Sequence, residues 1–270
     1  MENKLNEQSL DTLCGALAVV LGVEEPACAA APCQELISYA ENAFHGEKAD
    51  RIFMYNPDAI AQWVYEKYPA FLKNAVDKTE LSLPFCTVMP SVTPVCFGTM
   101  YTGAQPKVHG ITKYDKPVIR IDTLFDALIR AGKKPVIVAE TNCSLSKIFL
   151  EREMDYFIYD SVDEVNAKAA EIILKDEYDF VVVYNGNYDS TMHKNGPEAP
   201  ISLGELRSNA RTFAMFASMI ETHWKKHHTL LGFAMDHGCH EIDGECGSHG
   251  LDMPEDLNIV HRYMALPAES

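Results

Sequence analysis

Short apolar segments alternate with helical segments along most of this chain. The clearest apolar segment is residues 179–184 (DFVVVY), and further strands are predicted at 51–55, 134–139, 156–159 and 229–235. Helices are predicted beside them, over residues 34–44, 59–67, 121–130, 162–175 and 203–225. Strands that lack polar alternation and are separated by helices are typical of a parallel sheet covered on both faces. We therefore predict an α/β, doubly wound fold, with a mostly parallel central sheet and helices on both faces.

No repeat, low-complexity tract or charge block divides the 270 residues into obvious domains. A helix is predicted over residues 9–22, with Ser9 as its N-cap and Gly22 as its stop, before an irregular stretch at 26–33. We expect residues 1–48 to form an N-terminal helical segment packed on the core. Residues 49–270 then form one large domain.

The charge of the chain excludes several classes of protein. It contains 39 Asp and Glu against 23 Lys and Arg, a net charge of −16, which argues against a groove for a nucleic-acid duplex. No apolar run approaches the roughly 18–20 residues that span a bilayer, so no membrane partner is expected. The first residues lack a signal-peptide pattern, which favours a cytoplasmic location with eight reduced cysteines.

Reactive side chains in such sheets lie on the loops that follow the strands. Four such loops, at residues 56–58, 90–93, 185–193 and 236–240, contain carboxylates, hydroxyls or imidazoles. Three carboxylates and three imidazoles suit Zn²⁺ or Mn²⁺ and are enough for two ions with an open position on each. The candidate ligands are Asp58, Asp189, His193, Asp236, His237 and, in a Gly-Ser-His-Gly turn, His249.

Structural roles compete with these interpretations. Asp189 alone suits a turn, Asp236-His237-Gly238 suits a strand-to-turn junction, and Thr93 suits a helix cap. A structural zinc site is a separate alternative, although its residues lack a C-x-x-C pair. That site would use Cys239, His240, Cys246 and His249.

Thr93 is predicted to stand at a loop-to-helix junction. Free backbone N–H groups and the helix dipole favour an anion at such a position. A hydroxyl nucleophile there must lose its proton, and a bound divalent cation promotes this without a general base.

The segment around Thr93 resembles the nucleophile region of the alkaline phosphatase superfamily, in its type I phosphodiesterase/nucleotide pyrophosphatase branch. The matching residues are Thr93, Thr99, Thr102-Gly103, Pro106 and His109-Gly110-Ile111. The Asp-x-x-x-His motif at 189–193, the Asp-His-Gly motif at 236–238 and the isolated His249 follow in the family's order. The resemblance covers roughly residues 50–265, and four motifs in sequence are more specific than any single one.

The resemblance implies an alkaline phosphatase-like catalytic domain over residues 49–270 and a metal-dependent hydrolase of phosphoric esters. It implies Thr93 as the nucleophile, a small phosphorylated substrate, and two divalent ions, usually zinc, with Mn²⁺ as the alternative. One ion would be held by Asp58, Asp236, His237 and the Thr93 hydroxyl; the other would be held by Asp189, His193 and His249. The alternatives are a phosphomonoesterase, a phosphonate or sulfate-ester hydrolase, a phosphate mutase, or a non-catalytic member that binds a phosphorylated metabolite.

The chain departs from the family pattern at several points. Cys96 replaces an Asn that contacts a phosphoryl oxygen, and Asp58 stands in Asn-Pro-Asp-Ala rather than directly at a strand end before Gly. The chain is shorter than typical members, which implies a reduced cap over the substrate. Residues 13–26 resemble a helix that other members carry near the C-terminus, so a permuted element is a further hypothesis. The sequence identifies neither the leaving group nor the oligomeric state.

Overall fold

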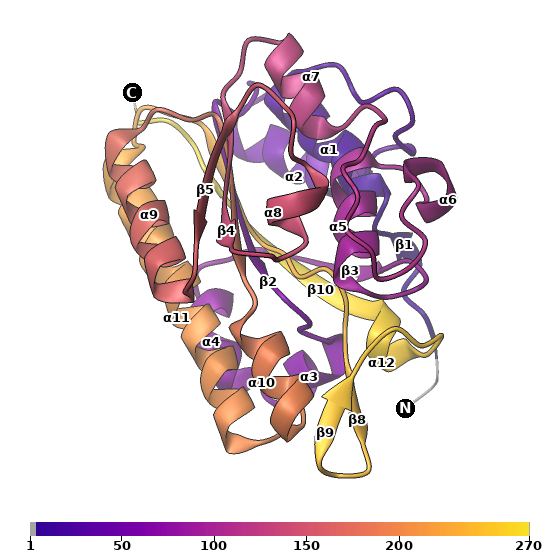
Figure 1. Ribbon diagram of the computed structural model, residues 1–270. Helices are drawn as coiled ribbons and strands as arrows, with labels where there is room; N and C mark the ends of the chain where they lie inside the picture. Colours follow the sequence, from indigo (N-terminus) through magenta and orange to yellow (C-terminus); the bar gives the residue numbers. More distant parts are fainter. Residues whose placement is uncertain (1–3, 270) are drawn as a thin grey trace.

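An eight-stranded sheet forms the centre of the computed structural model, which describes residues 4–269 (Figure 1). The strand order is β1-β3-β10-β7-β2-β6-β4-β5. In that order the strands are Gln8–Ser9, Leu81–Cys86, Asn258–Leu266, Thr229–Phe233, Arg51–Pro57, Phe180–Asn185, Pro135–Glu140 and Asp155–Tyr159.

The five strands from β7 to β5 are all parallel, and the apolar runs of the sequence predict each of them to within two residues. The antiparallel strand β10 lies between β7 and β3, and neither β10 nor β3 is predicted by the sequence pattern. Strand β3 contains Pro84 and alternates between buried and less buried positions, so its sequence lacks the continuous apolar run of the other strands. The predicted mostly parallel sheet is confirmed.

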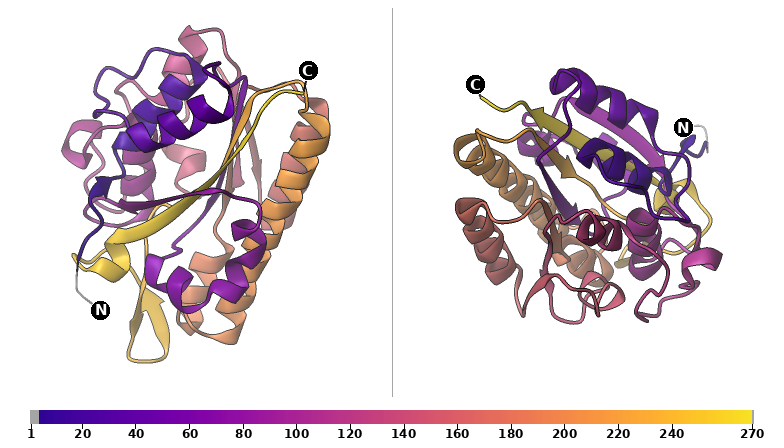
Figure 2. Two further views of the ribbon diagram at one scale, coloured as in Figure 1. Left: turned by 180° about the vertical axis from the view of Figure 1, so that it is seen from behind. Right: turned by 90° about the horizontal axis from the view of Figure 1, so that it is seen from above.

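Helices cover both faces of the sheet, which confirms the doubly wound α/β fold (Figures 1 and 2). Helices α4, α9 and α11 lie on one face, and α1, α5, α7 and α8 lie on the other. Strand β6 is buried along its whole length because both of its faces are covered. The bounds of the seven helices are Pro69–Val76, Val162–Lys175 and Pro200–His223 on the first face, and Thr12–Leu21, Thr93–Thr102, Leu124–Arg130 and Leu145–Ile148 on the second.

The N-terminal residues join the main sheet and one of its helical layers. Helix α1 ends at Gly22, whose φ of 69° supplies the left-handed turn, so the predicted stop is confirmed. The predicted cap is wrong: Asp11 precedes the helix, and Ser9 belongs to β1, where it pairs with Cys86. Helix α2 (Gln34–Ala43) packs against α1 and β10.

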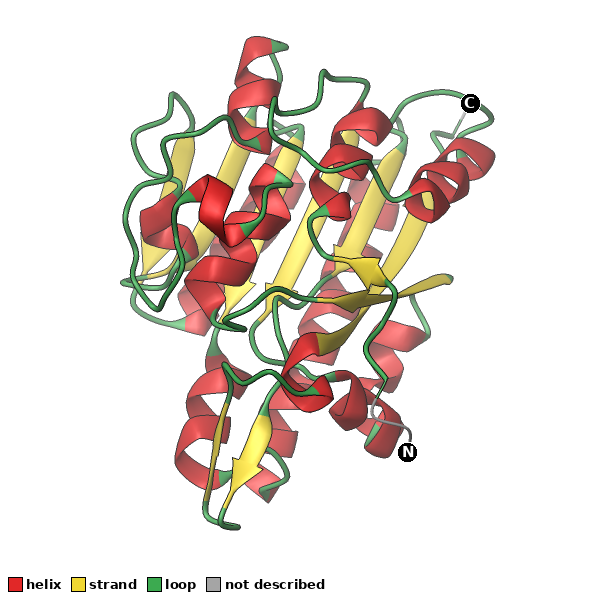
Figure 3. Cartoon of the chain, turned by 90° about the vertical axis from the view of Figure 1, so that its right-hand side faces the viewer, coloured by secondary structure: helices red, strands yellow, loops and turns green. Residues whose placement is uncertain are grey.

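Several short elements gather where the parallel strands end, at the bottom of Figure 1 and Figure 3. The expected loop at 185–193 is wrong, because most of it forms helix α10 (Asn187–Asn195). A hairpin of β8 (His240–Ile242) and β9 (Cys246–Ser248) packs against α10. The remaining helices are α3 (Gln62–Lys67), α6 (Pro106–His109) and α12 (Pro254–Leu257).

Helix starts move by up to three residues from their predicted positions. Helix α7 begins at Leu124 because Thr123 and Asp126 form a capping box, and α11 begins at Pro200, which suits the first turn of a helix. Among the described helices, none has both the length and the apolar character needed to cross a membrane.

Candidate functional site

Asp58, Asp236 and His237, here called the buried group, meet where two neighbouring strands end. Asp58 directly follows β2, and Asp236 and His237 follow β7, which pairs with β2. The three side chains are at most 1% exposed. His237 Nε2 lies 3.3 Å from Asp58 Oδ1 and 3.4 Å from Asp236 Oδ2. The ligand atoms of the buried group lie close enough together to hold one metal ion.

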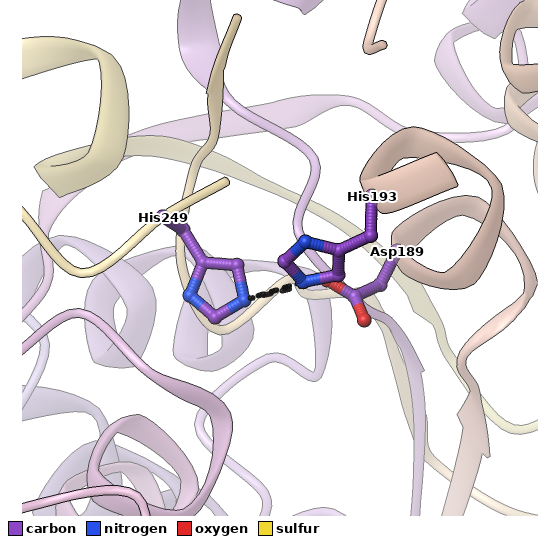
Figure 4. A group of neighbouring side chains, drawn as sticks. All are labelled: Asp189, His193 and His249. Carbon is purple, nitrogen blue, oxygen red and sulfur yellow. Dashed lines mark hydrogen bonds and ion pairs between the residues drawn. The ribbon is translucent and has the colours of Figure 1, made fainter. Parts of the chain in front are cut away.

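Asp189, His193 and His249 form a second cluster, here called the outer group (Figure 4). Asp189 and His193 lie one turn apart on α10, and His249 comes from the segment that follows β9. Asp189 Oδ1 lies 3.2 Å from His193 Nε2 and 3.5 Å from His249 Nε2. The rings of His249 and His237 stack with their centroids 4.0 Å apart, so the two groups are adjacent. The structure thus brings together all six carboxylate and imidazole side chains that the sequence predicts as metal ligands.

The three histidines of these groups all present Nε2 to the centre. In each ring Nδ1 faces a backbone carbonyl, which can only accept a hydrogen bond, so Nδ1 carries the proton and Nε2 has a free lone pair. His193 Nε2 and His249 Nε2 lie 3.1 Å apart, a separation that requires a proton or a cation between two lone pairs. The carbonyl partners are those of Gly247 for His193 at 3.0 Å, Gly238 for His237 at 2.9 Å and Ser91 for His249 at 2.9 Å.

One carboxylate oxygen of each aspartate is buried without a hydrogen-bond partner. These atoms are Asp58 Oδ1, Asp189 Oδ1 and Asp236 Oδ2. Buried carboxylates of this kind require a cation, and within residues 4–269 their ion-pair partners are the histidines of the two groups. A donor set of carboxylate oxygens and imidazole nitrogens suits Zn²⁺ or Mn²⁺. The residues therefore fit a pair of divalent ions.

The two groups differ in their electrostatics. Burial, and then the charge of Asp189, raises the pKa of Asp58 to about 7. Burial and the charge of Asp58 also raise the pKa of Asp236, and burial lowers the pKa of His237. Burial disfavours ionised Asp189 as well, but the neighbouring imidazoles of His193 and His249 hold its pKa below the usual range. The buried group thus has no internal counter-charge, whereas the outer group has one.

Asp58 is closer to a strand end than the sequence suggests, because β2 continues to Pro57. Its backbone N–H donates to the carbonyl of Asn185 at 3.1 Å, and the Tyr184 hydroxyl donates to Asp58 Oδ2. Sequence reasoning missed Tyr184, whose only signal was its place near the end of the strand next to β2. Ala59 has a φ of 64°, a left-handed conformation that glycine adopts most readily.

Thr93 is the first residue of α5, and its hydroxyl contacts the buried group. Its Oγ1 lies 3.2 Å from His237 Nε2 and 3.4 Å from Asp58 Oδ2. Val92 is the N-cap of α5 and no side chain caps the helix, so the capping interpretation of Thr93 is wrong. Thr93, Asp58 and Asp189 all line a cavity of about 210 Å³. Among the hydroxyl residues that line this cavity, Thr93 is therefore the one that contacts His237 of the buried group.

The other residues of the threonine motif hold α5 in place. The Thr99 hydroxyl lies 3.1 Å from His109 Nε2, and the Thr102 hydroxyl donates to the carbonyl of Gly98. Cys96 is buried and does not line the cavity, and its Sγ lies 4.0 Å from the carbonyl of Val88. A contact to a phosphoryl oxygen must therefore come from another residue.

The alternative structural zinc site does not form. Within the described residues, Cys239, His240 and Cys246 belong to neither group of potential ligands, and His240 Nδ1 pairs with Asp256 at 2.8 Å. The glycine of the Asp-His-Gly motif has a packing role, because a Cβ at Gly238 would lie 2.1 Å from the carbonyl oxygen of Glu255. All eight cysteines are free.

No protein-family model and no curated protein sequence matches the chain. Solved structures do. Murine ectonucleotide pyrophosphatase/phosphodiesterase 5 matches with a TM-score of 0.59 and 17% identity, and its human counterpart with 0.57 and 16%. An inactive threonine-to-alanine variant of the murine protein, in complex with AMP, matches with a TM-score of 0.58 and 16% identity.

The chain has the fold of these proteins. The matches cover 72% of this chain and 58% of each of the three solved chains, so this chain spans less than two thirds of their length. At such identities the likeness is one of fold. The predicted alkaline phosphatase-like α/β fold is confirmed.

Proposed function

We propose that the chain is a metal-dependent hydrolase of phosphoric esters, of the phosphodiesterase/nucleotide pyrophosphatase type, with Thr93 as its nucleophile. Two divalent ions, with zinc favoured over Mn²⁺, would bind to the buried group together with the Thr93 hydroxyl and to the outer group. The substrate is a small phosphorylated molecule. The fold shared with phosphodiesterase structures, one of them in complex with AMP, supports this proposal.

The observation that carries the proposal is the position of the Thr93 hydroxyl. It lies within 3.4 Å of a ligand atom of the buried group, and its side chain lines the same cavity as Asp189 of the outer group. It also stands at the first residue of a ten-residue helix, where the helix dipole attracts an anion. A phosphoryl group in the cavity would therefore lie beside both a nucleophile and two cation-binding clusters.

The chain's own residues account for the bond changes. As Thr93 Oγ1 forms a bond to phosphorus, the ester P–O bond on the opposite side breaks, and the leaving alcohol gains the proton that Thr93 loses. Water then hydrolyses the threonine phosphate and restores the hydroxyl. Bound divalent ions would lower the pKa of the hydroxyl and offset the charge that develops on the phosphoryl oxygens.

Replacing Thr93 with alanine tests the proposal. Thr93→Ala should reduce turnover of phosphate esters by at least about 1,000-fold, since the nucleophile is lost, while two metal ions per chain remain by elemental analysis. Thr93→Ser should restore part of the activity. Thr99→Ala is the matched control, because Thr99 lies on the same helix but contacts His109.

The substrate panel consists of phosphate monoesters, phosphate diesters, a phosphonate and a sulfate ester. Undiminished phosphatase and phosphodiesterase activity in Thr93→Ala would contradict the proposal. A preference for the phosphonate or the sulfate ester would assign the same site to one of those alternatives. Metal binding without turnover of any compound would favour the non-catalytic alternative.

A further inference from the structure

The cavity beside Thr93 also contains a polar recess, defined here by Lys116, Glu140 and Ser144. Tyr114, which is 61% exposed, also lines the cavity. At about 210 Å³, the cavity is smaller than the roughly 300–1,000 Å³ typical of drug-sized ligands. The group that fits there is small, and the polar lining indicates that it forms hydrogen bonds.

Glu140 supplies a carboxylate to this recess. Within residues 4–269 the Glu140 carboxylate accepts one hydrogen bond, from the backbone N–H of Gly186 at 2.7 Å, and forms no ion pair. A Cβ at Gly186 would lie 3.1 Å from Glu140 Oε2 and 2.8 Å from the Tyr184 hydroxyl, so a larger residue would crowd both groups. A partly buried carboxylate without a counter-ion favours a cationic hydrogen-bond donor.

Ser144 adds a second polar group. It is 1% exposed, and its Oγ is buried without a hydrogen-bond partner. Buried hydroxyls without partners are uncommon in native proteins, so this atom has an unused donor and acceptor beside the cavity. The nearby Lys116 ammonium is already engaged, since it donates to the carbonyl of Asn142 at 2.7 Å and lies 5.1 Å from the centre of the Tyr114 ring. Among the described residues, the Glu140 carboxylate therefore has no ion-pair partner, and the Lys116 ammonium is held by other groups.

We propose that this recess binds the leaving group of the substrate, and that the leaving group is a small amino alcohol. Glu140 binds its ammonium group, and Ser144 forms a hydrogen bond to it. The inference rests on the proposed function, because it places the ester oxygen of the amino alcohol next to Thr93. It makes Glu140 a specificity-determining residue.

The test uses the metal-loaded full chain and three esters that differ in one group: 2-aminoethyl, 2-hydroxyethyl and propyl phosphate, with their methyl diesters. An ammonium–carboxylate hydrogen bond contributes about 1.5–3 kcal/mol, so kcat/KM should be roughly 10- to 100-fold higher for the aminoethyl than for the propyl ester. Glu140→Gln should bring this ratio close to one. Glu80→Gln is the control, since Glu80 lies outside the cavity and contacts Tyr39.

The outcomes separate this inference from the proposed function. Thr93-dependent hydrolysis with a wild-type ratio near one, or with a ratio unchanged by Glu140→Gln, would overturn the inference and leave the proposed function intact. A preference for the hydroxyethyl ester would assign the recess to a hydroxyl and overturn the ammonium site. If no ester is hydrolysed, calorimetry of 2-aminoethyl and propyl phosphate binding decides. In that case, tighter binding of 2-aminoethyl phosphate than of propyl phosphate, lost in Glu140→Gln, supports an ammonium site in the recess. Equal binding of the two compounds overturns it.

Discussion

The buried group and the outer group contain the same kinds of ligand but differ in how the chain supports them. The buried group follows two paired strands at the centre of the sheet, and its side chains are at most 1% exposed. The outer group combines one short helix with the segment after a surface hairpin, and the His193 side chain is 40% exposed. Folding of the sheet therefore forms the first group, whereas packing of surface elements forms the second.

The two groups also differ in how far a bound cation is needed to balance their charge. In the buried group two carboxyl groups with raised pKa values share one histidine whose pKa is lowered. The group therefore lacks a positive charge of its own. In the outer group one carboxylate has two histidine partners, and the adjacent Asp189 carboxylate raises the pKa of His193. The buried group should couple ion binding to global stability, and the outer group should bind and release its ion through local motion.

The largest expected effect is the difference in stability between two variants, each of which lacks one histidine of one group. His237→Ala removes a fully buried side chain and a ligand of the buried ion, and we expect it to lower the free energy of unfolding by about 3–5 kcal/mol. His193→Ala should cost less than about 1 kcal/mol, because surface changes are small. Each variant should lose one ion, measured by elemental analysis after dialysis, with urea unfolding for stability. Equal losses of stability in the two variants would contradict the comparison.

The pH dependence of the metal-free protein tests the charge of the buried group. Asp58 has a folded pKa of about 7 against an ordinary value of 3.8. Between these values the folded chain retains a proton that the unfolded chain releases, so the free energy of unfolding falls as pH rises through this window. The contribution is about 4 kcal/mol at 1.36 kcal/mol per unit.

Asp58→Asn removes this titration. The free energy of unfolding is measured for the variant and for the wild type at pH 4 and at pH 8, with a chelator present to keep both proteins metal-free. The quantity compared is the difference between the two proteins at each pH. The difference should shift in favour of the variant at pH 8. Asp243→Asn, at an exposed position in the hairpin turn, should show no such shift. Parallel pH profiles for Asp58→Asn and wild type would show that Asp58 titrates normally.

The smallest effect concerns the backbone beside the buried group. Ala59 holds a φ of 64°, which costs an alanine roughly 1–2 kcal/mol, so Ala59→Gly should stabilise the protein by about 1 kcal/mol. Ala167→Gly, at an exposed position inside α9, should destabilise it by a similar amount. Opposite signs in thermal or urea unfolding would confirm the left-handed position, and a loss of stability in both variants would exclude it.

Local patterns account for most of what the sequence predicts correctly. The apolar run at 179–184 needs no information beyond its own residues to indicate a strand, and β6 occupies 180–185. Helix α9 matches its predicted range because Ser161 caps it and its apolar residues recur at helical spacing. The order of the motifs likewise indicates the six candidate ligands before any contact is known.

The missed features depend on contacts between distant residues. Strand β10 pairs with β3 across more than 170 residues, and Tyr184 reaches Asp58 from the neighbouring strand. The segment after β6 looked irregular because Asn, Gly and Asp favour turns, yet packing against α11 and the hairpin makes it helical. The division of the chain at residue 48, the identity of the ions and the cytoplasmic location stay predictions.

The sequence by itself determined the α/β architecture and the set of candidate ligands, since periodicity and motif spacing are properties of the local chain. Only the tertiary structure decided that these ligands form two clusters, that Thr93 contacts the buried group, and that Glu140 and Ser144 share its cavity. The physical reason is that a parallel sheet brings the ends of its strands to one edge. Which side chains meet there depends on strand order, and strand order is set by packing throughout the molecule.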